Sequence, residues 1–121
     1  MTVEIRVLQK PKILEVTYTT ERVTSTDLEE QRRLVAEALS KHDLRKVLID
    51  ASSLEQVPAI LTMFEHNTAV SSDKILQRSI FAVVFRSIGS NERFLETSGS
   101  NRGVRIKCFT SRDEALTWLS N

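Results

Sequence analysis

Two segments within the first eighteen residues alternate between apolar and polar side chains, which is typical of β-strands that have one face in water. The alternation occurs twice, in residues 3–7 and again in residues 14–18. The connection between them, Gln9 to Lys12, is too short for a crossover. The two segments are therefore predicted to form an antiparallel hairpin that starts the sheet at an edge.

Apolar residues then recur at helical intervals in four places. Thr26 precedes Glu29 by three residues, the spacing of a capping box, and predicts a helix from Asp27 to about Lys41. Pro58 suits the first turn of a second helix, whose end falls somewhere between residues 71 and 77.

The third helix is predicted from a cap at Ser90 to a stop near Gly99. Ser111 and Glu114 have the spacing of another capping box and open the last helix, in which Trp118 faces the core.

Three further strands separate these helices. Residues 46–50 are a short apolar run closed by polar residues, typical of a buried parallel strand. Residues 80–85 are apolar at both parities, which predicts a strand covered on both faces at the centre of the sheet. Residues 104–108 alternate again, and their outward positions are charged.

This order predicts one α/β domain spanning residues 1–121, with no internal linker. We expect a mixed five-stranded sheet, built from the N-terminal hairpin and then βα units, with about four helices and right-handed crossovers.

Charge and composition narrow the class of protein. The 121 residues include 17 Lys and Arg against 16 Asp and Glu, a net charge of +1. That balance argues against a nucleic-acid binder that works by bulk electrostatics. The longest apolar run, six residues from Ile80, is far shorter than a membrane span. A lone cysteine, Cys108, and an N-terminus without a secretory pattern lead us to expect a cytoplasmic protein.

No motif of a known catalytic chemistry stands out. His42, His66 and Cys108 do not have the spacing of metal ligands, and the three glycines do not form a phosphate-binding loop. We expect no metal, no cofactor and no enzymatic activity.

Open α/β sheets bind ligands outside the carboxyl ends of their parallel strands. In this chain those ends are residues 50–53, 86–90 and 109–111. Helix starts near Pro58, Ser90 and Ser111 would direct free N–H groups to the same rim. Each of these residues also suits an ordinary capping or turn role, so both interpretations stay open.

A group of basic residues between Arg78 and Arg112 also has two interpretations, since it fits either a binding surface or a solvated edge.

The C-terminal third carries a resemblance to a known family. Residues 100–104 (SNRGV), 107–110 (KCFT) and 113–119 (DEALTWL) resemble the SpoIIAA-like group of small bacterial proteins. These are relatives of STAS domains, named for sulfate transporters and anti-sigma-factor antagonists. Residues 47–50 (VLID), followed by Leu54 and Val57, are similar to the strand and loop at the heart of STAS domains.

The resemblance implies a mixed-sheet α/β fold and a role in binding partner proteins; some related domains hold lipids or nucleotides. Sporulation-type antagonists carry a phosphorylatable Asp-Ser-Ser-Gly at the start of the second helix. The matching positions here are residues 58–61 (PAIL), which contain no hydroxyl group. The phosphorylation switch and its kinase partner are therefore not expected.

Two functional hypotheses follow. The first is a non-enzymatic STAS-like interaction module, forming a homodimer and docking an unknown protein partner. The alternative is a carrier or sensor of a small amphipathic or anionic ligand, either lipid-like or nucleotide-like. The candidate binding residues are the polar residues of the rim and the apolar start of the second helix, which also suits a core role: Asp50, Ser52, Ser53, Ile60, Leu61, Phe64, Arg86, Ser87 and Ser90.

Overall fold

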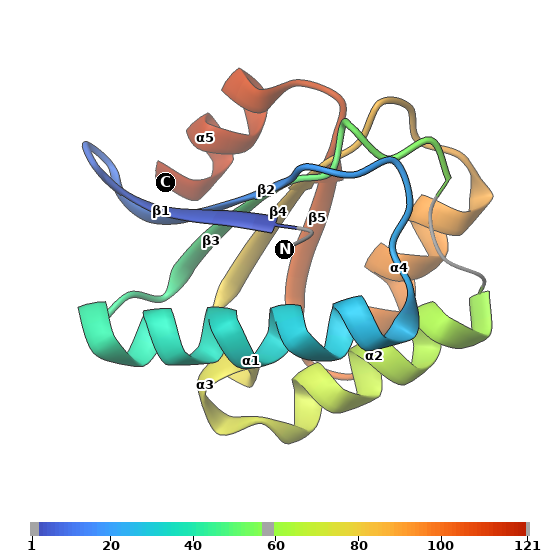
Figure 1. Cartoon of the computed structure of the whole chain (residues 1–121), viewed down its shortest axis with the longest axis horizontal. Coiled ribbons are helices and arrows are strands. Elements are labelled where there is room, and N and C mark those ends of the chain that lie inside the picture. The colour runs from blue at the N-terminus through green and yellow to red at the C-terminus, as the bar shows by residue number, and fades with distance from the viewer. Residues whose placement is uncertain (1–2, 57–59, 121) are drawn as a thin grey trace.

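The computed structural model describes residues 3–56 and 60–120 (Figure 1). Its elements, in chain order, are β1 (Val3–Gln9), β2 (Lys12–Tyr18), α1 (Ser25–His42), β3 (Lys46–Asp50), α2 (Ile60–Ser72), α3 (Lys74–Gln77), β4 (Ile80–Val84), α4 (Ser90–Asn101), β5 (Arg105–Phe109) and α5 (Arg112–Ser120). The α/β class and the five-stranded mixed sheet predicted from the sequence are confirmed.

The sheet has the order β1-β2-β3-β4-β5. β1 and β2 form the predicted antiparallel hairpin, in a register that places Arg6 opposite Glu15. The other three strands follow in parallel with β2. The central strand is β3, so the expectation that residues 80–85 form the centre is wrong. β4 lies one place further along and is still covered on both faces, as its continuous apolar run requires.

Helices cover the two faces of the sheet unequally. Helices α1 to α4 lie on one face, and α5 alone lies on the other (Figure 1). Each crossover moves one strand along in the same direction, and crossovers of one hand place their helices on the same face. Two hydrophobic layers result, a large one between the sheet and α1–α4 and a smaller one beneath α5.

One face of β2 was expected to be in water, and that expectation is wrong. Ile13 is fully buried in the layer beneath α5, and Leu14 and Val16 are fully buried in the layer on the opposite face. The intervening Glu15 is also buried. In the hairpin, the polar face in solvent belongs to β1, where Glu4 and Arg6 are exposed. The alternating strand β2 is buried on both faces because α5, which is distant in sequence, covers the face that was expected to be in water.

Helix α1 begins two residues earlier than predicted. Thr24, rather than Thr26, is the N-cap: its hydroxyl accepts a hydrogen bond from Asp27 N at 3.1 Å, and the Asp27 carboxylate accepts one from Thr24 N at 2.9 Å. The acid of a capping box is more often Glu, which is why Glu29 drew the sequence prediction toward Thr26. The helix ends at Asp43, which takes a left-handed conformation with φ 52°.

The second predicted helix is two helices. α2 ends at Ser72, and Asp73 caps α3 by accepting hydrogen bonds from the backbone of Ile75 and Leu76. The predicted start at Pro58 falls outside the described residues.

Helix α4 differs from its prediction at both ends. Gly89, rather than Ser90, is its N-cap, and the helix continues past Gly99 to Asn101. A side chain at Gly99 would approach the Ile106 Cγ2 atom to 2.8 Å. Gly99 therefore allows α4 to lie close against β5, whereas the turn after the helix uses Gly103, with φ 79°.

Helix α5 matches the expected position. Ser111 Oγ accepts a hydrogen bond from Glu114 N at 3.3 Å, and Ala115 and Leu119 are buried against the sheet. Trp118 is half-buried and packs on Phe109, with ring centroids 5.7 Å apart. Within the described part of the chain, no helix is long and apolar enough to cross a membrane.

Candidate functional site

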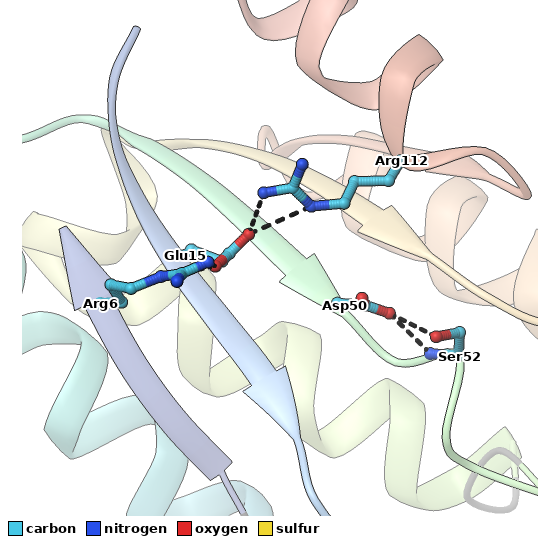
Figure 2. A network of polar contacts seen from close by, with 5 residues as sticks. All are labelled: Arg6, Glu15, Asp50, Ser52 and Arg112. Carbon is cyan, nitrogen blue, oxygen red and sulfur yellow. Dashed lines mark hydrogen bonds and ion pairs between the residues drawn. The ribbon is translucent and has the colours of Figure 1, made fainter. Parts of the chain in front are cut away.

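The polar residues predicted for the carboxyl edge are brought together by the loop after β3. Asp50 Oδ1 accepts hydrogen bonds from Ser52 N at 3.0 Å and from Ser52 Oγ at 2.6 Å (Figure 2). Arg86 follows β4, and its guanidinium donates to the backbone carbonyls of Ser52 and Ser53 at 3.2 and 3.3 Å. The edge thus gathers residues from two adjacent parallel strands, as their common direction requires.

The same bonds hold the loops to one another. Ser53 Oγ lies 2.9 Å from the carbonyl oxygen of Tyr18 and 2.8 Å from that of Thr20, so the loop after β3 is fixed to the end of β2. The Asp50 bonds form an Asx turn, a common local device of loops. The loops at this edge are consequently held together by Asp50, Ser52, Ser53 and Arg86, whose polar groups have partners within the chain.

The remaining predicted residues are spread along the same rim. Ser87 is exposed in the loop after β4, and Ser90 is the first residue of α4. The cap of α4 is closed by Glu92, whose carboxylate accepts a hydrogen bond from Gly89 N. Ile60, Leu61 and Phe64 belong to α2, but their side chains lie outside the described residues, so the proposed apolar rim stays a prediction.

A second polar cluster was not predicted and lies on the α5 side of the sheet (Figure 2). Glu15 stands between two arginines: Arg6 Nε donates to its Oε1 at 3.0 Å, and Arg112 Nε donates to its Oε2 at 3.2 Å. A second nitrogen of each guanidinium contacts the same oxygen. The Glu15 side chain is 5% exposed, against 69% for Arg6 and 42% for Arg112.

Burial alone would raise the pKa of the Glu15 carboxyl, but the hydrogen bonds and charges of Arg112 and Arg6 outweigh it and hold the pKa below its ordinary value. Glu15 is therefore ionised at neutral pH. The cluster joins β1, β2 and the first turn of α5. No local sequence signal could have found it, because Arg112 is 97 residues away from Glu15.

A small cavity lies in the larger hydrophobic layer. Its volume is about 70 Å³, and its walls are mostly apolar, with polar groups from Gln31, Arg32, His66 and Asn67. Arg32 donates to His66 Nδ1 at 2.8 Å, so His66 is a neutral acceptor there. Burial and then the charge of Arg32 lower the pKa of His66 to about 4.

Cys108 is a free, buried cysteine. Burial, together with the nearby charges of Glu96 and Glu92, raises the pKa of its thiol to about 12. The thiolate is the reactive form of cysteine, so these surroundings are those of an inert side chain. Within residues 3–56 and 60–120, the structure holds no group of three acidic, histidine or cysteine side chains arranged for a metal ion.

The basic group between Arg78 and Arg112 does not form one surface. Arg78 and Arg105 lie where β4 and β5 begin, and Arg105 donates to the Arg78 carbonyl at 3.1 Å. Arg86 and Arg112 lie at the opposite end of the sheet, on the two clusters described above. The parallel strands therefore separate residues that are close in sequence.

No family model matches the chain, and no curated protein sequence matches it. The class that the fold defines is an α/β protein with a mixed five-stranded sheet.

Proposed function

We propose that this chain is a non-enzymatic, STAS-like protein-interaction and regulatory module that lacks the phosphorylatable Asp-Ser-Ser-Gly switch. The observation that carries the proposal is the state of the carboxyl edge, where α/β enzymes hold substrates. Asp50, Ser52, Ser53 and Arg86 are bonded to each other and to loop backbone there. Such a rim is suited to presenting a rigid surface.

The order of elements supports the same proposal. The chain has a hairpin followed by βα units, and a mixed-sheet α/β fold is what the resemblance to STAS domains implies. Fold-level analogy suggests a class of function and does not identify a partner. The proposed module acts in the cytoplasm as a homodimer that docks a further protein.

Native mass spectrometry of the gently purified protein tests this function, because one spectrum reports subunit number and any retained molecule. We expect a dimer, or a complex with a second protein. A bare monomer at high concentration, together with an empty capture from a bacterial lysate, would contradict the proposal.

The second candidate function, a ligand carrier or sensor, is favoured by the cavity beside His66. The cavity combines apolar walls with polar groups from α1 and α2, as ligand sites do. Its 70 Å³ is well below the roughly 300 Å³ at which pockets for drug-sized ligands begin. The carrier would therefore hold a molecule of a few heavy atoms. Extra mass that disappears on denaturation in the same spectrum would support it, and an unmodified mass would count against it.

A further inference from the structure

The positive charges of the chain are concentrated at one end of the sheet. Strands β2 to β5 are parallel, and the segments that lead into them are residues 9–12, 41–46, 73–78 and 101–105. Together these segments hold nine Lys and Arg and two Asp, a net charge of +7. The rest of the chain holds eight Lys and Arg against fourteen Asp and Glu, a net charge of −6. We call the four segments the basic end.

The cations of the basic end face solvent. All nine are exposed except Lys46, which is half-buried. One of the two acids there is engaged locally, because the Asp73 carboxylate accepts hydrogen bonds from Ile75 N and Leu76 N at 2.9 and 3.1 Å. The near-neutral total therefore conceals a strongly positive surface, which attracts anionic partners over a Debye length.

A groove of about 510 Å³ opens at the same end, beside the edge strand β5. It is lined by Ile80 at the start of β4, by Trp118 and the buried Leu119 at the end of α5, and by residues around the start of β5: Ser100, Gly103, Val104, Arg105 and Ile106. Val104 and Ile106 pack in the layer beneath α1–α4, so the partly exposed apolar side chains of the groove on the α5 side are Ile80 and Trp118. In the register of the sheet, Ile80 lies between Lys46 and Arg105, so an apolar floor residue has a cation on each side. Trp118 is half-buried there, and tryptophan is frequent among the residues that dominate binding energy.

We propose that this groove binds a linear acidic segment of a partner protein, with one apolar side chain seated against Ile80 and Trp118 and carboxylates beside Arg105 and Arg78. The proposal rests on the proposed function, since it assigns the surface and the chemistry of the partner. Charge complementarity selects an acidic partner, and the groove of about 510 Å³ has room for an apolar side chain.

The lining favours a peptide over a nucleic acid. Phosphates are bound by several hydrogen-bond donors, whereas the side-chain donors that line this groove are Ser100, Arg105 and Trp118, and its other lining side chains are apolar. Binding of single strands uses a series of stacking side chains, and the groove contains one aromatic residue, Trp118. An acidic peptide with an apolar anchor matches both the charge and the lining.

Trp118 is the only tryptophan of the chain, so its fluorescence reports occupation of the groove directly. The probe is a synthetic acidic peptide of about twelve residues that carries one central Leu, a length typical of groove-bound segments. We expect saturable binding that shifts or quenches the Trp118 emission and weakens with added salt. The same peptide with Gln in place of its acids, or Ser in place of Leu, should bind at least about tenfold more weakly.

Two double variants with the same change in net charge show whether the peptide binds at the basic end. Arg78→Glu/Arg105→Glu changes two exposed residues of the basic end, and Arg22→Glu/Arg93→Glu makes the same change in net charge at two exposed positions outside it. We expect the first pair to weaken peptide binding by about tenfold or more and the second by about twofold or less. If the first pair disturbs folding, as circular dichroism would show, the neutral pairs Arg78→Gln/Arg105→Gln and Arg22→Gln/Arg93→Gln replace them.

Three results would overturn the proposal: no binding of the acidic peptide, equal weakening by the two variant pairs, or binding without a change in Trp118 emission. Tighter binding of duplex DNA or of phosphatidylserine vesicles than of the peptide would overturn it as well. None of these results would contradict the proposed function. That function is contradicted by a different result, a monomer that retains no partner.

Discussion

At the scale of single residues, Glu15 shows how a polar position in an alternating strand became part of the interior. It is buried, yet both of its oxygens accept hydrogen bonds from arginines that remain partly exposed. Ionic groups are tolerated inside proteins when they are paired in this way. Glu15 therefore ties β1 and α5 to β2 at a position that an apolar residue would otherwise fill.

Glu15→Gln is expected to destabilise the protein by about 1–3 kcal/mol, because it removes the acceptor charge of two charge-assisted interactions. Chemical denaturation gives the difference in unfolding free energy. The matched control is Glu37→Gln, which removes the carboxylate of the exposed pair with Arg33, at 3.1 Å on α1. Exposed pairs contribute less than about 1 kcal/mol, so equal losses for the two variants would contradict the structural role of Glu15.

His66 predicts how stability depends on pH. Its folded pKa of about 4 lies below the ordinary value of 6.5, so the unfolded chain binds more protons in between. Stability is therefore complete above about pH 6.5 and falls as the pH drops toward 4, by up to about 3 kcal/mol. Glu15 affects stability in a lower range of pH. Because its folded pKa lies below the ordinary glutamate value of 4.5, its contribution is lost only as the pH falls below that value.

Denaturation midpoints between pH 7 and pH 4 measure this dependence. His66→Gln should flatten the slope between pH 6.5 and 4.5. A slope that persists in His66→Gln would show that other groups cause it.

At the scale of elements, the existence of the strands and helices was predictable, whereas their ends were not. Periodicity located every strand, and the boundaries of α1 and α4 depended on which residue accepts the first hydrogen bonds. Gly99 illustrates the difficulty. It has the residue type of a helix stop, but it lies inside α4, where the approach to Ile106 requires it.

The cap of α1 provides a test with a built-in control. Thr24→Ala should destabilise the protein by about 1 kcal/mol, since it removes the side chain that accepts from Asp27 N. Thr26→Ala lies two residues away, is exposed, and should change stability by less than about 0.5 kcal/mol. Thermal denaturation of the two variants compares them, and a larger loss for Thr26→Ala would restore the cap position that the sequence suggested.

At the scale of the whole molecule, two hydrophobic layers share one sheet. Buried residues of β2 and β4 contribute to both layers. If the sheet comes apart, both layers are therefore exposed to water together. Small domains of this kind unfold in one cooperative step.

We therefore expect a single transition in urea, with the same midpoint by two probes. Trp118 fluorescence reports the layer beneath α5, and far-ultraviolet circular dichroism reports mainly the helices on the opposite face. Separate midpoints would show that α5 detaches before the rest of the sheet unfolds.

The sequence by itself determined the α/β class, the hairpin and the approximate positions of the longer helices along the chain, because these depend on local spacing of apolar residues. It also placed Asp50, Ser52 and Arg86 at one rim, because the ends of adjacent parallel strands meet there. Only the tertiary structure decided what the side chains meet: Glu15 with an arginine 97 residues away, His66 with Arg32, and nine cations at one end of a nearly neutral chain. Those encounters depend on strand order and on the face that each helix covers, and they leave no periodic signal in the sequence.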